Sequence, residues 1–341
     1  MKLLVTGGAG FIGSNFTRMA LKAKPDWEVT VLDKLTYAGR RENLEDLDND
    51  PRFRFILGDI CDEKTVSKAM EGCEAVVNFA AETHVDRSID DPASFVRTDI
   101  EGVRVLLEVF RKEDRQFFLQ ISTDEVYGSV EEGSSVETDQ LVPRSPYAAS
   151  KAGGELLAMS YWTTYGVPVT VTRASNNYGP FQYPEKLIPL FITNAMTGEP
   201  LPLYGDGLNR RDWLFVEDHC RALIMVIEKS EPGRIYNIGA GQEYTNLEVT
   251  SSILEITGAD RSLVRYIEDR PGHDRRYALN VDLIESEIGW KADTCFSDGL
   301  KKTVDWYGRN STWWEKIKSG EFREYYRSMY TERLENSRES G

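Results

Sequence analysis

Histidine and cysteine are scarce in this chain of 341 residues, which contains three histidines and four cysteines. The cysteines are scattered without a C-x-x-C spacing, so the sequence suggests neither a zinc site nor a disulfide framework. No apolar run reaches membrane-spanning length, and the first residues lead into a predicted strand without the pattern of a signal peptide. We therefore expect a reduced, cytoplasmic protein that binds no metal ion.

Positive charge is also in short supply. The sequence has 56 acidic and 41 basic residues, which gives a formal net charge of -15. This balance argues against a nucleic acid or an anionic membrane surface as a partner. The hydrophobic share of 40% and the charged share of 28% are typical of an ordinary globular enzyme. The length suggests about two domains.

A glycine-rich turn separates the first predicted strand from the first predicted helix. Gly7, Gly10 and Gly13 have a spacing that lets the backbone approach a pyrophosphate at a helix N-terminus. Asp33 ends the second predicted strand, where a carboxylate binds a ribose diol and repels a 2′-phosphate. The pattern predicts NAD rather than NADP, but nearby cations leave room for a 2′-phosphate: Lys34, Arg40 and Arg41.

Apolar segments and helical segments alternate along the first half of the chain. We expect strands at 2–6, 29–32, 53–57, 75–79, 117–121 and 169–172, and helices from the glycine turn to about 24 and at 65–70, 99–111 and 147–165. Repeated units of this kind predict an α/β fold with a doubly wound parallel Rossmann sheet. We expect residues 1–172 to form the NAD-binding Rossmann domain, with part of 212–240 returning to it. Residues 173–341 then form mainly a smaller, irregular α/β substrate domain.

Hydroxyl and acidic side chains follow the predicted strand at 117–121. Two adjacent carboxylates cannot both be buried in a strand, because successive side chains point to opposite faces and an unpaired buried charge is costly. We therefore place Thr123, Asp124 and Glu125 in the loop beyond the strand. Ligands of open α/β sheets bind at such carboxyl ends.

A tyrosine and a lysine lie one turn apart at the start of a predicted helix. Ser145 suits the N-cap and Pro146 the first helical position, so Tyr147 and Lys151 share a face. Free tyrosine has a pKa of about 10. A lysine cation and a helix N-terminus both favour the phenolate, so we expect a lowered pKa and a catalytic role for this pair, with Thr123 close by.

The helix at 147–165 is apolar on more than one face. Such a helix packs both on the sheet and on another surface. We therefore expect a homodimer built on the helices at 99–111 and 147–165.

Irregular, proline-rich segments follow the strand at 169–172. We interpret 176–180, 184–187, 202–205, 209–213 and 269–273 as loops that carry ligand contacts. They include Lys186, Arg211 and Arg270, which are cations in an acidic chain. Because the planar guanidinium group suits phosphate oxygens, the set suggests a pocket for an anionic substrate that carries a ring.

These motifs resemble those of a known family. The glycine spacing at 7–13 together with Tyr147-x-x-x-Lys151 resembles the extended short-chain dehydrogenase/reductase family. The run Ser-Thr-Asp-Glu-Val-Tyr-Gly at 122–128 resembles its dTDP-glucose 4,6-dehydratase branch. The similarity extends from Met1 to about Tyr330 and includes the segments at 32–39 and 176–180.

The resemblance implies contacts with NAD and with a nucleotide sugar. For the cofactor it implies Gly7, Gly10, Phe11, Ile12, Gly13, Asp33, Lys34, Leu35, Thr36, Asp59, Ile60, Phe79, Ala80, Ala81, Glu82, Thr83, Thr98, Tyr147, Lys151 and Asn177. For the sugar nucleotide it implies Thr83, Thr123, Asn176, Lys186, Leu187, Pro202, Leu203, Tyr204, Arg211, Asn246, Asp269, Arg270, Pro271, Gly272, His273 and Tyr330. The family usually has asparagine where this chain has Asp99, and we expect a small effect of that exchange.

The resemblance also implies a reaction on dTDP-glucose. Tyr147 takes the proton of the 4-hydroxyl group while hydride leaves carbon 4 for NAD, with Thr123 and Lys151 polarising that position. Glu125 then removes the proton of carbon 5, and Asp124 protonates the departing 6-hydroxyl group. Hydride returns to carbon 6 and gives a 4-keto-6-deoxy sugar.

Three alternatives remain open. An NAD-dependent nucleotide-sugar epimerase or decarboxylase shares the tyrosine but usually lacks the adjacent acids. A UDP- or GDP-sugar dehydratase differs only in its base pocket. A non-catalytic NAD-sensing protein needs the glycines but neither Tyr147 nor Lys151.

Overall fold

A parallel sheet of seven strands forms the larger part of the computed structural model, which describes residues 1–269, 272–320, 322, 324–326, 329–330 and 333–334. The strand order is β3-β2-β1-β4-β5-β6-β10. The strands are β1 (Lys2–Thr6), β2 (Glu28–Asp33), β3 (Phe53–Leu57), β4 (Ala75–Asn78), β5 (Phe117–Thr123), β6 (Val169–Ala174) and β10 (Ile235–Ile238). The predicted Rossmann sheet is confirmed. Its order reverses between β1 and β4, which opens a crevice at their carboxyl ends.

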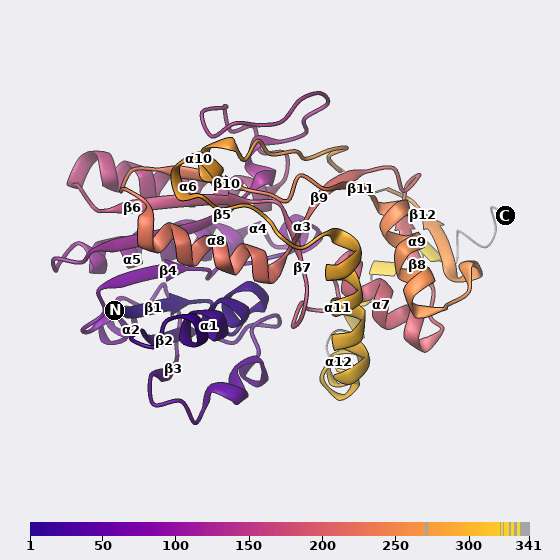
Figure 1. Cartoon of the computed structure of the whole chain (residues 1–341), viewed down its shortest axis with the longest axis horizontal. Coiled ribbons are helices and arrows are strands. Elements are labelled where there is room, and N and C mark those ends of the chain that lie inside the picture. Colours follow the sequence, from indigo (N-terminus) through magenta and orange to yellow (C-terminus); the bar gives the residue numbers. More distant parts are fainter. Residues whose placement is uncertain (270–271, 321, 323, 327–328, 331–332, 335–341) are drawn as a thin grey trace.

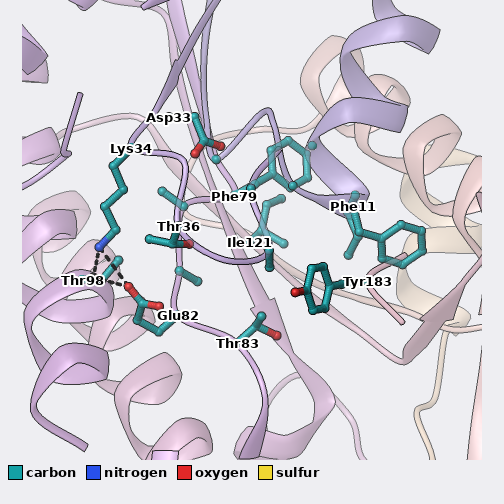
Figure 2. A pocket seen from close by; sticks show the side chains of 18 of the residues that line it. Phe11, Asp33, Lys34, Thr36, Phe79, Glu82, Thr83, Thr98, Ile121 and Tyr183 are labelled. Carbon is teal, nitrogen blue, oxygen red and sulfur yellow. Dashed lines mark hydrogen bonds and ion pairs between the residues drawn. The ribbon is translucent and has the colours of Figure 1, made fainter. Parts of the chain in front are cut away.

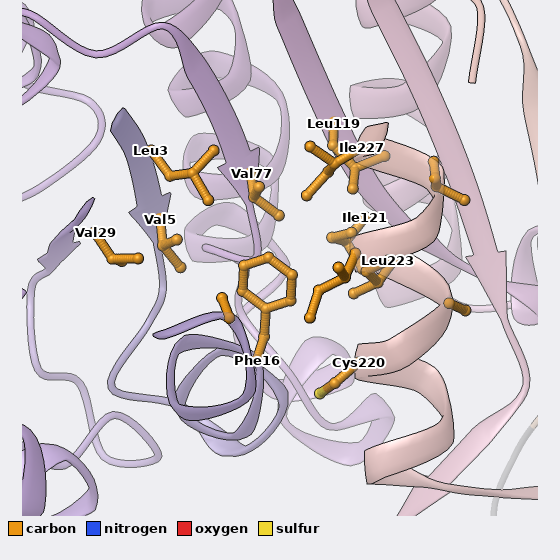
Figure 3. Packing of buried hydrophobic residues seen from close by; sticks show 14 of the residues in the cluster. Leu3, Val5, Phe16, Val29, Val77, Leu119, Ile121, Cys220, Leu223 and Ile227 are labelled. Atoms are coloured by element: carbon orange, nitrogen blue, oxygen red, sulfur yellow. The ribbon is translucent and has the colours of Figure 1, made fainter. Parts of the chain in front are cut away.

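Helices cover both faces of this sheet, because alternate strand residues point to opposite sides. Leu3 and Val5 of β1 pack with Phe16 of α1 and Leu223 of α8 on one face (Figure 3). Leu4 belongs to the hydrophobic cluster on the other face. The first face is covered by α1 (Phe11–Ala23), α8 (Val216–Lys229) and α10 (Asp282–Ile288). The second is covered by α2 (Glu63–Met70), α5 (Val103–Phe110) and α6 (Pro146–Tyr165).

A second hydrophobic core lies beside the sheet, at the right of Figure 1. Two small sheets belong to this part, one in the order β11-β9-β7 and one that pairs β12 with β8. Their strands are β7 (Asn176–Tyr178), β8 (Leu201–Tyr204), β9 (Arg210–Phe215), β11 (Glu243–Thr245) and β12 (Val264–Ile267). The accompanying helices are α7 (Leu187–Thr197), α9 (Asn246–Thr257), α11 (Phe296–Arg309) and α12 (Ser311–Ser319).

Three segments that we expected to be loops are strands. Asn176–Tyr178 pairs in parallel with Trp213–Phe215, and Pro202 lies inside β8. Proline is tolerated there because β12 is the one strand paired with β8 in the described part of the chain, and proline within sheets occurs on such edge strands. These pairings join segments far apart in the sequence, and local composition does not reveal them.

The helix predicted at 99–111 begins earlier than expected. The chain enters α4 (Pro92–Val96) after Asp91, whose side chain accepts a hydrogen bond from Ser94 N. A π-helical segment, Arg97–Gly102, then joins α4 to α5 and carries Thr98 and Asp99. Segments of this kind are frequent at functional sites.

The remaining short elements connect the larger ones. They are α3 (Val85–Asp90) and the 3₁₀ turns Arg41–Leu47, Asp124–Tyr127 and Arg261–Leu263. No helix in the described part of the chain is both long enough and apolar enough to cross a membrane.

Candidate active site

The glycine turn between β1 and α1 is closely packed. Gly7 has a φ angle of +68°, and a Cβ atom there would lie 2.5 Å from the backbone nitrogen of Ala80. A Cβ atom on Gly13 would lie 2.4 Å from the carbonyl oxygen of Gly7. A Cβ atom on Gly10 would approach only that same oxygen, at 3.3 Å. Gly7 and Gly13 are therefore required by the turn itself, whereas Gly10 leaves room for a ligand at the N-terminus of α1.

A first cavity extends from this turn to the start of α6 (Figure 2). Most of the predicted cofactor contacts line it: Gly7, Gly10, Phe11, Ile12, Gly13, Asp33, Lys34, Thr36, Ile60, Phe79, Ala80, Ala81, Glu82, Thr83, Thr98, Tyr147 and Lys151. Leu35, Asp59 and Asn177 are not among its lining residues, and Asn177 lines the second cavity described below.

Asp33 and Lys34 have different environments within this cavity. Asp33 is buried, and its carboxylate accepts hydrogen bonds from the backbone nitrogens of Ala9 (2.9 Å) and Leu35 (2.8 Å). Burial raises the pKa of Asp33. The ammonium group of Lys34 pairs with Glu82 at 2.9 Å (Figure 2). Because Lys34 is engaged in this way, the cavity favours a ribose diol over a 2′-phosphate.

The other two cations near the fingerprint are also engaged by acids. Arg40 pairs with Glu42 at 2.9 Å, and Arg41 pairs with Asp48. Because both arginines are paired with acids, they also favour NAD over a cofactor with a 2′-phosphate.

The two adjacent acids lie in a 3₁₀ turn directly after β5. Thr123 caps this turn, since its hydroxyl group accepts a hydrogen bond from Glu125 N at 3.3 Å and donates one to Asp124 Oδ1 at 3.2 Å. Asp124 is buried, and burial together with the charge of Glu125 raises its pKa well above the ordinary value. Glu125 is only half-buried and lines the second cavity. The environments therefore favour a neutral Asp124 beside an accessible Glu125.

Tyr147 and Lys151 line the first cavity from the first turn of α6. The Lys151 ammonium group is buried and donates a hydrogen bond to Ile121 O at 2.8 Å. Ser145 caps the helix as predicted, accepting from Ala148 N at 3.1 Å.

The expected lowering of the tyrosine pKa is wrong for the chain alone. Burial raises the pKa of Tyr147 well above its ordinary value, and the carboxylates of Glu125, Asp99 and Asp124 raise it further. A hydrogen bond with Thr123 acts in the opposite direction, but it is a smaller influence. The spacing in the sequence places Lys151 one turn from Tyr147. It does not reveal that the fold brings the carboxylates of Glu125, Asp99 and Asp124 close to the same tyrosine.

A second cavity adjoins the first, and Gln182, Glu185 and Lys186 line both. Most of the predicted substrate contacts line it together with Glu125: Asn176, Lys186, Leu187, Pro202, Leu203, Tyr204, Arg211, Asn246, His273 and Tyr330. Thr83 lines the first cavity, whereas Thr123, Asp269 and Gly272 line neither. Arg270 and Pro271 lie outside the described residues.

The second cavity offers cations and open polar groups. Arg211 is buried, and its guanidinium group donates to the carbonyl oxygens of Arg210 (2.7 Å) and Asp274 (2.8 Å). Buried polar atoms on the wall have no hydrogen-bond partner among the described residues: Asn176 Oδ1, Gln182 Oε1 and Trp213 Nε1. Such a wall suits a polar, anionic ligand.

A cluster around Arg87 supports the wall between the cavities, and sequence reasoning missed it. The Arg87 guanidinium group lies 3.7 Å from the ring centre of Tyr37 and 4.0 Å from that of Tyr325. It also pairs with Glu185 at 3.1 Å, and Tyr37 donates to the same carboxylate at 2.8 Å. Residues from three distant segments thus fix Glu185 beside Lys186.

Other lining residues were also missed. Tyr37, Ala38 and Gly39 line the first cavity and belong to the segment at 32–39 that carries the resemblance, so a signal was present. His84, Asp86 and Trp213 line the second cavity without a recognisable local pattern. Within the described residues, no group of three or more histidine, cysteine or acidic side chains could hold a metal ion.

Comparison with known proteins identifies the class. Residues 4–303 match the family described as GDP-mannose 4,6 dehydratase, and the chain therefore belongs to that family.

Particular relatives are more informative about the reaction. The chain is 52% identical over 323 residues to a dTDP-glucose 4,6-dehydratase of Streptomyces niveus, covering 94% of this chain and 96% of that protein. It resembles the solved structure of DesIV, a dTDP-glucose 4,6-dehydratase from Streptomyces venezuelae with NAD bound, with a TM-score of 0.91 and 52% identity over 93% of this chain and all of that one. A UDP-glucose 4-epimerase of Thermus thermophilus in complex with NAD is more distant, with a TM-score of 0.84 and 32% identity over 91% of this chain and all of that one.

Proposed function

We propose that this chain catalyses the NAD-dependent dehydration of dTDP-glucose to dTDP-4-keto-6-deoxyglucose. The observation that carries the proposal is the placement of Asp124 and Glu125 at the end of β5. One acid is buried and the other faces the second cavity, while Tyr147 and Lys151 line the first. An epimerase needs the tyrosine but has no use for a second acid–base pair.

The first cavity fits NAD. The glycine turn and the N-terminus of α1 would hold the pyrophosphate, and Asp33 would accept hydrogen bonds from a ribose diol. The open position at Gly10 gives the diphosphate space close to the backbone. When bound, NAD would supply an acceptor for the hydride of carbon 4 and a donor of the same hydride to carbon 6.

The residues of the chain move the protons. Tyr147 takes the proton of the 4-hydroxyl group, and the ketone that results at carbon 4 makes the proton of carbon 5 acidic. Glu125 removes that proton. Asp124, whose pKa burial raises well above the ordinary value, donates its proton to the departing 6-hydroxyl group, and water leaves. When hydride returns to carbon 6, Glu125 gives a proton back to carbon 5. The proton that Tyr147 took balances the one that Asp124 gave.

The second cavity suits the nucleotide diphosphate of the substrate. Lys186 and Arg211 supply positive charge in a strongly acidic chain, and Asn176 and Trp213 line the cavity with one buried polar atom each that has no hydrogen-bond partner among the described residues.

The test is to incubate the purified protein with dTDP-glucose, UDP-glucose and GDP-mannose and to weigh the products. We expect the dTDP-sugar to lose one water and the other two to react slowly. Loss of water from the UDP- or GDP-sugar alone would change the base assignment. An isomer of unchanged mass would indicate an epimerase instead.

The homodimer is a further part of the proposal. Leu156 (59%), Trp162 (37%) and Tyr165 (56%) of α6 are exposed apolar side chains, and a second copy of the chain would cover them. Light scattering at micromolar concentration checks this, and a monomer would contradict it. The division into an NAD-binding and a substrate domain, and the cytoplasmic location, stay predictions.

A further inference from the structure

Asp99 places a buried carboxylate behind the catalytic pair. It lies in the π-helical segment Arg97–Gly102 and is only 2% exposed. Its Oδ1 atom accepts a hydrogen bond from Glu82 N at 3.0 Å, and its Oδ2 atom accepts one from the Ser150 hydroxyl group at 2.6 Å. Ser150 is the immediate neighbour of Lys151, so the carboxylate is fixed beside the first turns of α6.

The charges that face Asp99 come from α6 and from the segment after β4. Lys151 attracts the carboxylate, and Tyr147 lies close enough for Asp99 to act on its ionisation. Glu82 is the other acid on this side, but Lys34 neutralises it at 2.9 Å. Farther along α6, Glu155 also acts on Lys151 but is engaged by Arg173, whereas Asp99 has no arginine or lysine within 4.0 Å among the described residues. The remaining charges of the adjoining helix α5, Arg104, Glu108 and Arg111, pair with one another or with Glu101 at the surface.

We propose that Asp99 is a positioning residue whose negative charge keeps Lys151 protonated and sets the pH range in which Tyr147 acts as a base. The proposal rests on the proposed function, in which Tyr147 takes the proton of the 4-hydroxyl group. It replaces the expectation that a carboxylate at this position, instead of the family's usual asparagine, has a small effect.

The sign of the effect follows from the two interactions. Burial lowers the pKa of Lys151, and the charge of Asp99 is the largest influence that raises it. The same charge raises the pKa of Tyr147. Burial also raises the pKa of Asp99 itself to about 6, so the carboxylate carries its charge fully only above that pH. Removing the charge therefore lowers both the lysine and the tyrosine pKa.

Asp99→Asn removes the charge and keeps the hydrogen bonds. The amide oxygen can accept from Glu82 N, and the amide nitrogen can donate to Ser150. The Ser150 hydroxyl group then donates to Tyr147 O, which already lies 2.9 Å away. A purely structural role of Asp99 therefore predicts an unchanged pH profile for this variant.

The experiment measures kcat/KM for dTDP-glucose against pH in the wild type and in Asp99→Asn. We expect both limbs of the profile to move to lower pH in the variant by on the order of one pH unit, the size of one charge acting over roughly 10 Å in a protein interior. Glu101→Gln removes a charge of the same sign two residues away, where Glu101 is exposed and paired with Arg104 at 2.7 Å. This matched control is expected to keep the wild-type profile. Coincident profiles for wild type and Asp99→Asn, or a shift to higher pH, would overturn the proposal.

A second readout needs no turnover. Lysine labelled with carbon-13 at Cε reports the titration of Lys151 by NMR, and the signal is assigned by its loss in Lys151→Met. We expect Lys151 to titrate at lower pH in Asp99→Asn than in the wild type, and an unchanged midpoint would count against the proposal. If the wild type fails to dehydrate dTDP-glucose, the proposed function falls, whereas this titration still decides whether Asp99 sets the charge of Lys151.

Discussion

The first cavity takes most of its walls from βα turns of one parallel sheet, whereas the second takes them from segments spread between His84 and Tyr330. Backbone atoms of the glycine turn shape the first cavity, and their geometry is set by close packing. Side chains shape the second, and one of them, Glu185, is held by an ion pair with Arg87, which in turn stacks on Tyr37 and Tyr325. A site shaped by closely packed backbone thus adjoins a site shaped by side chains.

The residues proposed for the two chemical steps are also divided between the two cavities. Tyr147 and Lys151, which act at carbon 4 in the proposed mechanism, line the first cavity, and Glu125, which acts at the neighbouring carbon 5, lines the second. Asp124 is buried and lines neither cavity. We therefore expect substitutions in the two cavities to affect different steps.

Glu125→Gln is expected to have the largest effect and to separate the steps. Glutamine keeps the shape of the side chain but cannot accept the proton of carbon 5, so elimination slows by roughly 10²–10⁴, the usual contribution of a positioned base. Oxidation at carbon 4 continues, because the residues of the first cavity are unchanged. In heavy water, NMR of the sugar is expected to show deuterium at carbon 5 with the wild type and hardly any with the variant. Glu131→Gln, which removes an exposed charge, serves as the control. Carbon 5 exchange at the wild-type rate in Glu125→Gln would rule out this base.

Gly13→Ala and Gly10→Ala are expected to differ in their loss of stability, although both weaken NAD binding. At Gly13 the new methyl group would meet backbone 2.4 Å away, so both stability and NAD affinity fall, the affinity by roughly 100-fold. At Gly10 the methyl group would approach only the Gly7 carbonyl oxygen, at 3.3 Å, so NAD affinity falls with a much smaller loss of melting temperature than at Gly13. Calorimetry of unfolding and of NAD binding measures both. Equal losses of stability in the two variants would contradict the distinction.

Asp99→Asn is expected to raise stability in a pH-dependent way. Because the pKa of Asp99 is raised to about 6 in the folded chain, ionisation opposes folding, and stability is lost as pH rises from about 4 through about 6. Removing the carboxyl group therefore stabilises the fold above pH 6, by up to about 3 kcal/mol, and has little effect near pH 4. Denaturant titrations at pH 4.5 and pH 8, values chosen on either side of about 6, measure the difference. An equal gain at both pH values would show that the charge is not responsible.

Arg87→Met is expected to loosen the wall shared by the cavities. The substitution leaves the buried carboxylate of Glu185 without its arginine and removes the stacking on Tyr37 and Tyr325. We expect a loss of about 2 kcal/mol of stability, below the full cost of breaking a buried pair because Arg87 is partly exposed, and a higher KM for the sugar nucleotide. Arg104→Met, at an exposed pair, is expected to cost less than about 0.5 kcal/mol. A change in NAD affinity without a change in KM would place the cluster in the other cavity.

The residues of the first cavity and the two acids after β5 could be predicted because their signals are local. The glycine turn, Asp33, the two acids after β5 and the pair Tyr147 and Lys151 each lie within one βα unit. Their spacing reflects backbone geometry that a single strand and helix determine. The same holds for the parallel sheet, whose strands repeat at regular intervals.

The second cavity was harder to predict because its walls depend on long-range pairing. β7 acquires its strand conformation from β9, more than thirty residues later, and composition alone indicated loops. The contacts of Arg87 join Tyr37, Glu185 and Tyr325 across most of the chain. The raised pKa of Tyr147 has the same origin, since Asp99 and Glu125 approach it only in the fold.

The most direct test of the dehydratase assignment follows one labelled atom. The wild-type protein is incubated with dTDP-glucose that carries deuterium at carbon 4, with NAD present in no more than the amount of enzyme, and the product is analysed by NMR and mass spectrometry. The account predicts many turnovers and a 4-keto-6-deoxy sugar whose label has moved to carbon 6. Deuterium found in free reduced cofactor, or retained at carbon 4 of an epimerised sugar, would contradict it.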